Sequence, residues 1–234
     1  MTTLNLLSAG AARGLVLALQ AQFSAATGAT LNVSFGAVGA MREALLGGAP
    51  CDVIILTDAL IDALAQEGRA DATSRAALGR VRTGVAVRAG CPHPDVATAA
   101  GLKAALQGAD ALYFPDPAKA TAGIHFAHVM RELGVHDALA PHFHAHPNGA
   151  TAMRELAAST SPQPIGCTQV TEILYTPGVE LVGLLPTEFE LATVYTAAVT
   201  PQAADAALAA QFIALLAGDS ALALRRAGGF EVQP

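Results

Sequence analysis

The strongest constraint on the fold of this chain is a regular alternation between two kinds of segment. Short stretches rich in Leu and β-branched residues alternate with Ala-rich stretches whose apolar residues recur at helical spacing. This alternation is typical of proteins in which a mainly parallel sheet is covered by helices. We therefore predict an α/β fold.

The boundaries of the elements follow from the apolar spacing and from turn residues. The predicted strands are residues 4–8, 30–35, 53–56, 81–88, 111–114, 141–146, 165–170 and 191–199. The predicted helices are residues 12–27, 38–46, 59–67, 98–107, 122–133, 149–158, 203–217 and 220–226. Gly28 is expected to end the first helix, and Asp58 is expected to be the N-cap of the third.

Composition limits the partners. The chain has 234 residues, of which 53% are apolar and 14% charged, so it can bury a core as one large domain or as two lobes. Its net charge of −6 provides no basic field, and we expect no nucleic-acid partner. A small anion is compatible with this charge, because helix N-termini bind anions without Lys or Arg.

The number of cysteines and the first residues of the chain indicate the cellular compartment that we expect. Three cysteines cannot form a complete disulfide framework, which favours a reducing environment. Residues 1–7 are predicted to form a strand in place of a signal peptide, so we expect a cytoplasmic protein, or a periplasmic one if the sequence is a processed form. The apolar runs are shorter than the ~20 residues of a membrane span, and none is expected.

Four segments combine the end of a strand, a turn that contains Gly and small or polar residues, and the start of a helix. They are Ser8–Ala12, Phe35–Met41, Asp116–Ile124 and His146–Thr151. In an open α/β sheet these turns gather beyond the carboxyl ends of the strands, where ligands bind. Unpaired N–H groups at the helix starts would suit an oxyanion or a carboxylate. The alternative is that these are ordinary turn residues.

The same segments carry a resemblance to a known family. The motifs are Ser8 at the end of the first strand, Gly47–Ile55, Asp116–Ile124 and Pro164–Gly166. By these motifs the chain resembles the periplasmic molybdate-binding proteins and the type II solute-binding protein superfamily. The resemblance implies two α/β lobes that close on a small anion by hinge bending. The implied lobes are residues 1–82 with 197–234 and residues 83–196, joined by crossing strands near 81–86 and 192–198.

Residue by residue, the resemblance is uneven. Ser8 matches the first oxyanion-binding serine of the family, but Val38-Gly39 stands where a second serine is expected, so that only backbone N–H groups remain there. Ala122 and Gly123 match a third turn that binds through backbone. The family's tyrosine near Gly166 is absent. These differences favour an organic carboxylate over molybdate, bound by a receptor or sensor domain that would meet a transporter permease only if it is exported.

The candidate ligand-binding residues come from these turns and from neighbouring strands. They are Ser8, Ala9, Gly36, Val38, Gly39, Arg82, Thr121, Ala122, Gly123, Asn148, Gly149, Thr168 and Gln169. Arg82 is included because a guanidinium binds carboxylates in a bidentate manner. We expect no cofactor, since the chain lacks the nucleotide-binding and zinc-protease motifs. We also expect no metal: alternating His142, His144 and His146 fit a metal site, but a solvated strand face explains them better.

An enzyme is the alternative to a receptor. The chain is similar to the branch of this fold that includes aconitate isomerase, which implies a cofactor-free isomerase of a polycarboxylate acting by proton transfer. His125, one helical turn after Thr121, and Glu172 are the candidate catalytic residues, with His146 as a further candidate. The favoured alternative for His125 is a helix residue bonded to a neighbouring carbonyl. Cys51 and Cys167 do not suggest a cysteine hydrolase.

Overall fold

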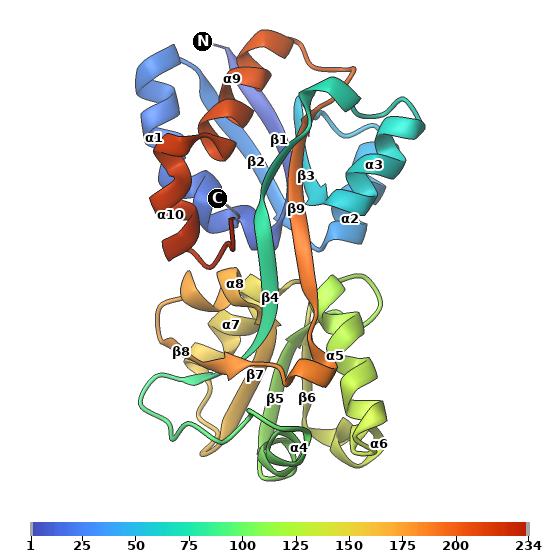
Figure 1. Ribbon diagram of the computed structural model, residues 1–234, viewed down its shortest axis with the longest axis vertical. Helices are drawn as coiled ribbons and strands as arrows, with labels where there is room; N and C mark the ends of the chain where they lie inside the picture. Colours follow the sequence, from blue (N-terminus) through green and yellow to red (C-terminus); the bar gives the residue numbers. More distant parts are fainter. Residues whose placement is uncertain (1, 233–234) are drawn as a thin grey trace. The chain divides into compact units, whose positions relative to one another are not determined.

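The structure of the chain is a computed structural model and describes residues 2–232. The chain divides into two compact units (Figure 1). Unit 1 comprises residues 1–81 and 193–234, and unit 2 comprises residues 82–192. The predicted α/β class is confirmed, since strands and helices alternate along the chain. The hinge motion implied by the resemblance stays a prediction.

The sheet of unit 1 has a parallel core and one antiparallel strand. Strand β1 (Thr3–Ala9) lies between β2 (Thr30–Gly36) and β3 (Val53–Thr57), and both pair with it in parallel. Strand β9 (Ala192–Val199) pairs with β3 in the antiparallel direction. Strand β3, which was predicted from its short apolar run, is buried on both faces. This is expected for a strand in the interior of such a sheet.

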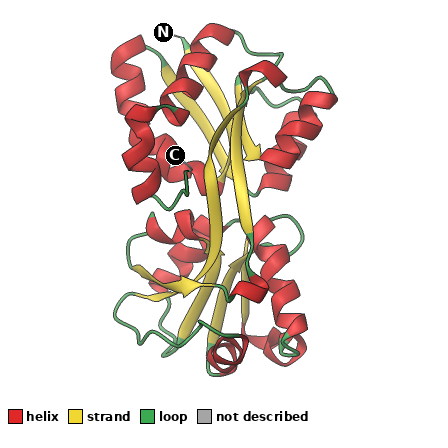
Figure 2. Ribbon diagram, in the orientation of Figure 1, coloured by secondary structure: helices red, strands yellow, loops and turns green. Residues whose placement is uncertain are grey.

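Helices cover both faces of this sheet (Figures 1 and 2). On one face lie α1 (Arg13–Thr27), α9 (Ala206–Ala217) and α10 (Leu222–Ala227), and on the other lie α2 (Val38–Leu46) and α3 (Asp58–Gln66). Side chains of β1 alternate between the two cores: Leu6 packs with α1 and α9, and Leu7 packs with α2 and α3. Phe23 of α1 meets Phe212 of α9 edge to face, with ring centroids 4.8 Å apart.

Two buried charged side chains connect the segments of unit 1. The Asp52 carboxylate accepts hydrogen bonds from the backbone N–H of Asn5 at 2.6 Å and from that of Ala204 at 2.8 Å. The Arg225 guanidinium donates to the carbonyl of Leu78 at 3.0 Å and to the carbonyl of Ala217, at the end of α9, at 2.6 Å. Both side chains are almost fully buried, so their charges are matched by backbone groups.

The sheet of unit 2 is also mixed. Strand β5 (Ala111–Pro115) pairs in parallel with β6 (Phe143–His146) and β7 (Pro164–Gln169). Strand β4 (Ala76–Arg88) enters unit 2 at residue 82 and pairs in the antiparallel direction with β7 and with β8 (Val179–Leu184). The last two pairings place Thr83 opposite Gln169 and Gly84 opposite Leu184.

The helices of unit 2 again define two cores. The larger core joins the sheet to α4 (Ala99–Gln107) and α5 (Thr121–Glu132), and it includes Val85 and Cys167. The smaller core joins the other face to α7 (Gly149–Ala158) and α8 (Val170–Leu174). A short helix, α6 (His136–Leu139), follows α5.

The structure corrects several predicted boundaries. Strand β4 begins at Ala76, five residues earlier than predicted, and the predicted strand at 141–146 begins only at Phe143 because Ala140–His142 form a 3-10 turn that contains Pro141. Asp58 is the first residue of α3, and Thr57 is its N-cap. The sequence analysis missed α6, α8 and β8. The remaining 3-10 turns are Gly10–Ala12, Ala72–Ser74, Thr187–Phe189 and Asp219–Ala221.

The C-terminal helices are apolar, but each is short relative to a membrane span. Within residues 2–232, no single helix is long and apolar enough to cross a bilayer. The pair formed by α9 and residues Asp219–Ala227, bent by 47°, meets the requirement by length and composition only.

Candidate functional site

In unit 1, the carboxyl ends of β1 and β2 lead into helices that have no side-chain cap. Ala9 precedes the 3-10 turn before α1, and Ala37 precedes α2; neither position has a capping side chain. Val38 and Gly39 are the first two residues of α2, so their N–H groups belong to the unpaired first turn of a helix. Binding of a ligand by these N–H groups stays a prediction.

Two other candidates of unit 1 have local structural roles. Ser8 is completely buried, and its hydroxyl donates to the carbonyl of Ala9 at 3.1 Å. A Cβ atom at Gly36 would lie 2.7 Å from the terminal methyl of Met41, so the absence of a side chain makes room for that methionine. Contact of these residues with a ligand stays a prediction.

In unit 2, α5 also begins without a side-chain cap. Thr121, Ala122 and Gly123 are its first three residues, after Ala120 as N-cap. A Cβ atom at Gly123 would lie 2.2 Å from the carbonyl oxygen of Pro115. Close packing of α5 against the end of β5 therefore requires this glycine, whether or not a ligand is bound.

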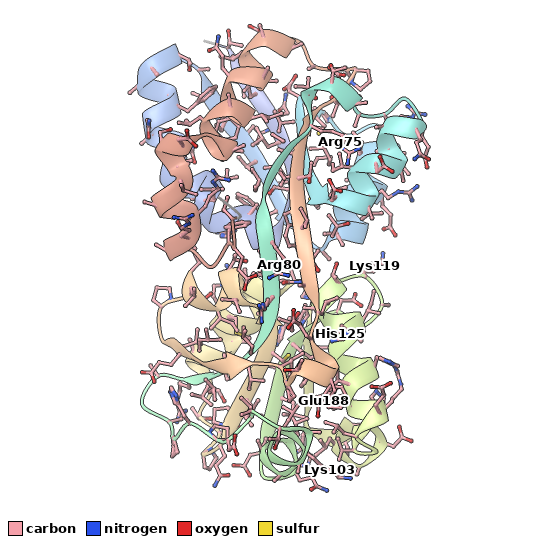
Figure 3. All side chains as sticks on the ribbon, viewed as in Figure 1. Arg75, Arg80, Lys103, Lys119, His125 and Glu188 are labelled. Carbon is pink, nitrogen blue, oxygen red and sulfur yellow. The ribbon has the colours of Figure 1, made fainter. Side chains whose placement is uncertain are left out.

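His125, labelled on α5 in Figure 3, contacts the protein backbone. Its Nε2 atom lies 2.8 Å from the carbonyl oxygen of Phe189. Because a carbonyl oxygen only accepts, Nε2 is the donor in this hydrogen bond. The helix residue bonded to a carbonyl, which the sequence analysis kept as the alternative, is what the structure contains. A role for Nδ1 in proton transfer is still compatible with this contact.

The start of α7 is occupied by a carboxyl group of the protein itself. The Thr168 hydroxyl donates to Oε2 of Glu172 at 2.6 Å, and a Cβ atom at Gly149 would lie 1.9 Å from the same oxygen. Backbone N–H groups of Ala150, Gln169 and Gly149 also interact with this carboxyl group. Glycine at 149 thus gives the carboxyl group access to the helix N-terminus.

Burial controls the ionisation of Glu172. The side chain is 7% exposed, and burial raises its pKa from an ordinary value of 4.5 to about 7, against the opposing effect of the hydrogen bonds from Thr168 and the backbone. A carboxyl group with this pKa exchanges a proton near neutral pH, which suits a general acid or base. Asn148 has a different role, since its Oδ1 accepts from the N–H of Thr151 at 2.9 Å and caps α7.

Next to this group, two buried side chains make no hydrogen bond. Thr83 and Gln169 are direct partners on β4 and β7, with exposed fractions of 1% and 3%. The Thr83 hydroxyl and both polar atoms of the Gln169 amide have no partner in the part of the chain that the structure describes. We call these two residues the polar pair. A buried polar group left unpaired costs about 1–3 kcal/mol.

Arg82 already has a carboxylate partner. Its Nη1 atom lies 3.2 Å from Oε2 of Glu190. A guanidinium paired in this way has less charge to offer a ligand. Binding of a ligand by Arg82 stays a prediction.

Of the three alternating histidines, His144 and His146 of β6 both stack on the Tyr113 ring, and His142 precedes the strand. His142 lies in the preceding 3-10 turn and bonds the carbonyl of Asp110 through Nδ1 at 3.0 Å, while the His144 ring stacks on Tyr113 with centroids 4.7 Å apart. Burial lowers the pKa of His146. Over residues 2–232, no group of three or more His, Cys, Asp or Glu side chains is arranged to hold a metal ion.

The thiols of Cys51, just before β3, and Cys167, within β7, are buried. Burial raises the pKa of Cys51 to about 12 and also raises that of Cys167. Since the thiolate is the reactive form, neither is suited to be a nucleophile at neutral pH.

Comparison with known proteins places this arrangement in a family. Residues 4–231 match the model of a family described as bacterial extracellular solute-binding protein. The chain belongs to this family. The membership confirms the resemblance inferred from the motifs and implies a small-molecule ligand.

Individual relatives agree with this assignment. An aconitate isomerase from a Pseudomonas species is 28% identical over 242 residues, covering 97% of this chain and 87% of that protein. The periplasmic molybdate-binding protein of Azotobacter vinelandii superposes with a TM-score of 0.81 at 22% identity, covering 99% and 100% of the two chains. The sulfate-binding protein SubI of Mycobacterium tuberculosis H37Rv gives 0.75 at 18% identity, covering 100% and 88%. The two structures confirm the predicted periplasmic-binding-protein fold.

For this solute-binding protein, sequence reasoning did not select Thr83 as a candidate. Thr83 interrupts the apolar alternation of β4 just before Gly84, Val85 and Ala86, and that polar interruption is the signal that could have found it. Thr171 was also missed: it is 2% exposed, and its hydroxyl makes no hydrogen bond within the described residues. Helix α8, in which Thr171 lies, has only 5 residues and is too short to be recognised from helical periodicity.

Proposed function

We propose that this protein reversibly binds a small organic carboxylate, as a receptor or sensor domain of the solute-binding family. The observation that carries the proposal is the position of Glu172, whose carboxyl group occupies the start of α7. A tetrahedral dianion placed at that helix start would displace or repel the carboxylate. An organic acid can bind at the uncapped start of α5 and direct its remaining atoms elsewhere.

The rest of the proposal rests on the family and the backbone. The helix starts at Val38 and Thr121 offer N–H groups that bind a carboxylate without a cationic side chain. Because the family is described as extracellular, we also propose that the protein is exported from the cytoplasm. An exported receptor of this kind would deliver its ligand to a membrane permease.

A thermal-shift panel tests the ligand class. The panel contains citrate, the aconitate isomers, malate, succinate, sulfate and molybdate, each followed by calorimetry where it shifts the transition. A ligand at a hundred times its Kd adds about 2.7 kcal/mol of stability, so binding is readily detected. We expect shifts with carboxylates and none with sulfate or molybdate. A shift with molybdate alone contradicts the carboxylate assignment, and no shift with any anion contradicts the binding function as proposed.

A charge substitution tests the reason for this selectivity. If the Glu172 carboxylate excludes tetrahedral dianions, Glu172→Gln should allow sulfate or molybdate to bind more tightly than in the wild type at pH 8. Glu155→Gln, on the exposed side of α7, is the matched control and should leave anion binding unchanged. Equal affinities in all three proteins would remove Glu172 from this role.

A cofactor-free isomerase of a polycarboxylate is the second candidate. It is favoured by the 28% identical aconitate isomerase and by a buried carboxyl group that titrates near neutrality. In this reaction a base takes a proton from the carbon next to a C=C bond, the double bond shifts, and an acid returns a proton to the far carbon. Glu172 and Nδ1 of His125 are the candidate proton carriers.

Hydrogen exchange distinguishes an enzyme from a receptor. Aconitate incubated with the protein in deuterated water should gain deuterium and change isomer if the protein is an isomerase, as followed by NMR. The same experiment with Glu172→Gln and His125→Ala assigns the roles. Undiminished exchange in His125→Ala excludes His125, and no exchange with the wild type leaves the receptor as the function.

A further inference from the structure

The polar pair lies at the end of the larger core of unit 2. Along β4, Thr83 shares its face with Val85, and along β7, Gln169 shares its face with Cys167; both apolar neighbours belong to the core that α5 covers. The pair therefore continues an apolar face at the carboxyl end of β7. Opposed residues of antiparallel strands have Cβ atoms about 5 Å apart, so one small ligand group could contact both.

The fold does not need these polar atoms. The backbone of Thr83 is already satisfied, since its N–H donates to the carbonyl of Leu191 at 3.1 Å and its carbonyl accepts from the N–H of Leu185 at 3.2 Å. Two other buried threonines bond protein groups, since Thr168 donates to Glu172 and Thr196 donates to Asp58 at 2.8 Å, whereas the Thr171 hydroxyl makes no hydrogen bond within the described residues. Against this background, the unpaired hydroxyl and amide point to a ligand as their partner.

The pair offers both donors and acceptors. The Gln169 amide has one donating and one accepting end, whichever way it is turned, and the Thr83 hydroxyl both donates and accepts. A fully deprotonated oxyanion presents only acceptors, so it would pair with the amide nitrogen and leave the amide oxygen beside its negative charge. A ligand with an O–H group can satisfy both ends.

We infer that Gln169 and Thr83 select anions that also carry a hydrogen-bond donor, such as the hydroxyl of a hydroxycarboxylate. The inference rests on the proposed function, in which the ligand is a small organic carboxylate. A site built to bond a ligand hydroxyl discriminates strongly against the analogue that lacks it, because its buried polar groups are then left unpaired. We expect a preference of at least about tenfold.

Two pairs of acids that differ only in a hydroxyl test the inference. Calorimetry compares citrate with propane-1,2,3-tricarboxylate, and malate with succinate, at one pH and ionic strength. The wild type should bind the hydroxy acid of at least one pair about tenfold or more tightly than its partner. Gln169→Met should abolish this preference and largely retain the affinity for the acid without the hydroxyl. Gln163→Met, just before the start of β7, should keep the preference.

A second variant, Thr83→Val, keeps the inference testable if Gln169→Met does not fold. Thr83→Val preserves the shape of the side chain and removes only the hydroxyl, and it should reduce the preference at least several-fold. In the free protein both variants should melt no lower than the wild type, because each removes a buried polar group that has no protein partner.

The possible results distinguish a failure of the selection role of Gln169 and Thr83 from a failure of the proposed carboxylate-binding function. Binding of the acids without preference for the hydroxyl, or an unchanged preference in both Gln169→Met and Thr83→Val, overturns the selection role and leaves the proposed function standing. No binding of any of the acids by the wild type overturns both.

Discussion

Glu172 makes a specific prediction about how stability depends on pH. The perturbation is Glu172→Gln, which keeps the shape of the side chain and an acceptor for the Thr168 hydroxyl but removes the titration. In the wild type the folded carboxyl group has a pKa of about 7, whereas the unfolded one keeps its ordinary value of 4.5. Between these values the folded state holds a proton that the unfolded state has lost.

The sign and the size of the effect follow from this difference. Because the folded state binds more protons in this window, the contribution of Glu172 to stability is largest below about pH 4.5, falls as the pH rises towards 7, and is level above that. Each pH unit between the two pKa values corresponds to about 1.4 kcal/mol, so the total loss is about 3 kcal/mol.

Urea unfolding at a series of pH values measures the effect. The quantity compared is the free energy of unfolding of the wild type minus that of Glu172→Gln. This difference should fall by about 3 kcal/mol between about pH 4.5 and about pH 8. Taking the difference cancels the titration of the other groups, including His146. Parallel pH profiles for the two proteins would refute the reasoning, since they would mean that the carboxyl group is solvated or permanently ionised.

Two further predictions concern packing and buried charge, both measured by urea unfolding. Gly149→Ala should cost about 1–3 kcal/mol, because the new Cβ would overlap the Glu172 carboxyl group, whereas Gly108→Ala, with the nearest atom 3.5 Å away, should change stability by less than about 0.5 kcal/mol; similar costs would contradict the packing reason for the glycine. Arg225→Met should cost about 3 kcal/mol, since it leaves buried carbonyls at the end of α9 without a donor, and the exposed neighbour Arg226 should tolerate the same change. Equal stability of the two arginine variants would show that these carbonyls find water.

Much of the fold could be predicted because the determining signals are local. The apolar run at Val53–Thr57 forms a buried strand, and the apolar spacing of Leu15, Leu19 and Phe23 places all three in one core. Strand β8 was missed because its side chains are only partly buried, so neither alternation nor a continuous apolar run marks it. Its position depends on pairing with β4, which is a tertiary contact.

The candidate site was less predictable for the same reason. Gly149 and Asn148 were selected as ligand contacts from turn chemistry, whereas the structure gives the glycine a packing role against Glu172 and the asparagine a capping role. Glu172 was selected, but its contact with the start of α7 joins residues far apart in sequence. The polar pair likewise depends on the register of β4 and β7, which no local pattern specifies.

The division of unit 1 into two stretches of chain has a consequence for biosynthesis. A ribosome completes all of unit 2 before it makes β9, α9 and α10, so the second unit can mature while the first still lacks part of its sheet and core. Until then β3 has an unpaired edge, and the Asp52 carboxylate has no contact with Ala204. A released fragment that ends at residue 192 should therefore protect the later unit from proteases and leave the earlier one open to cleavage and to chaperones.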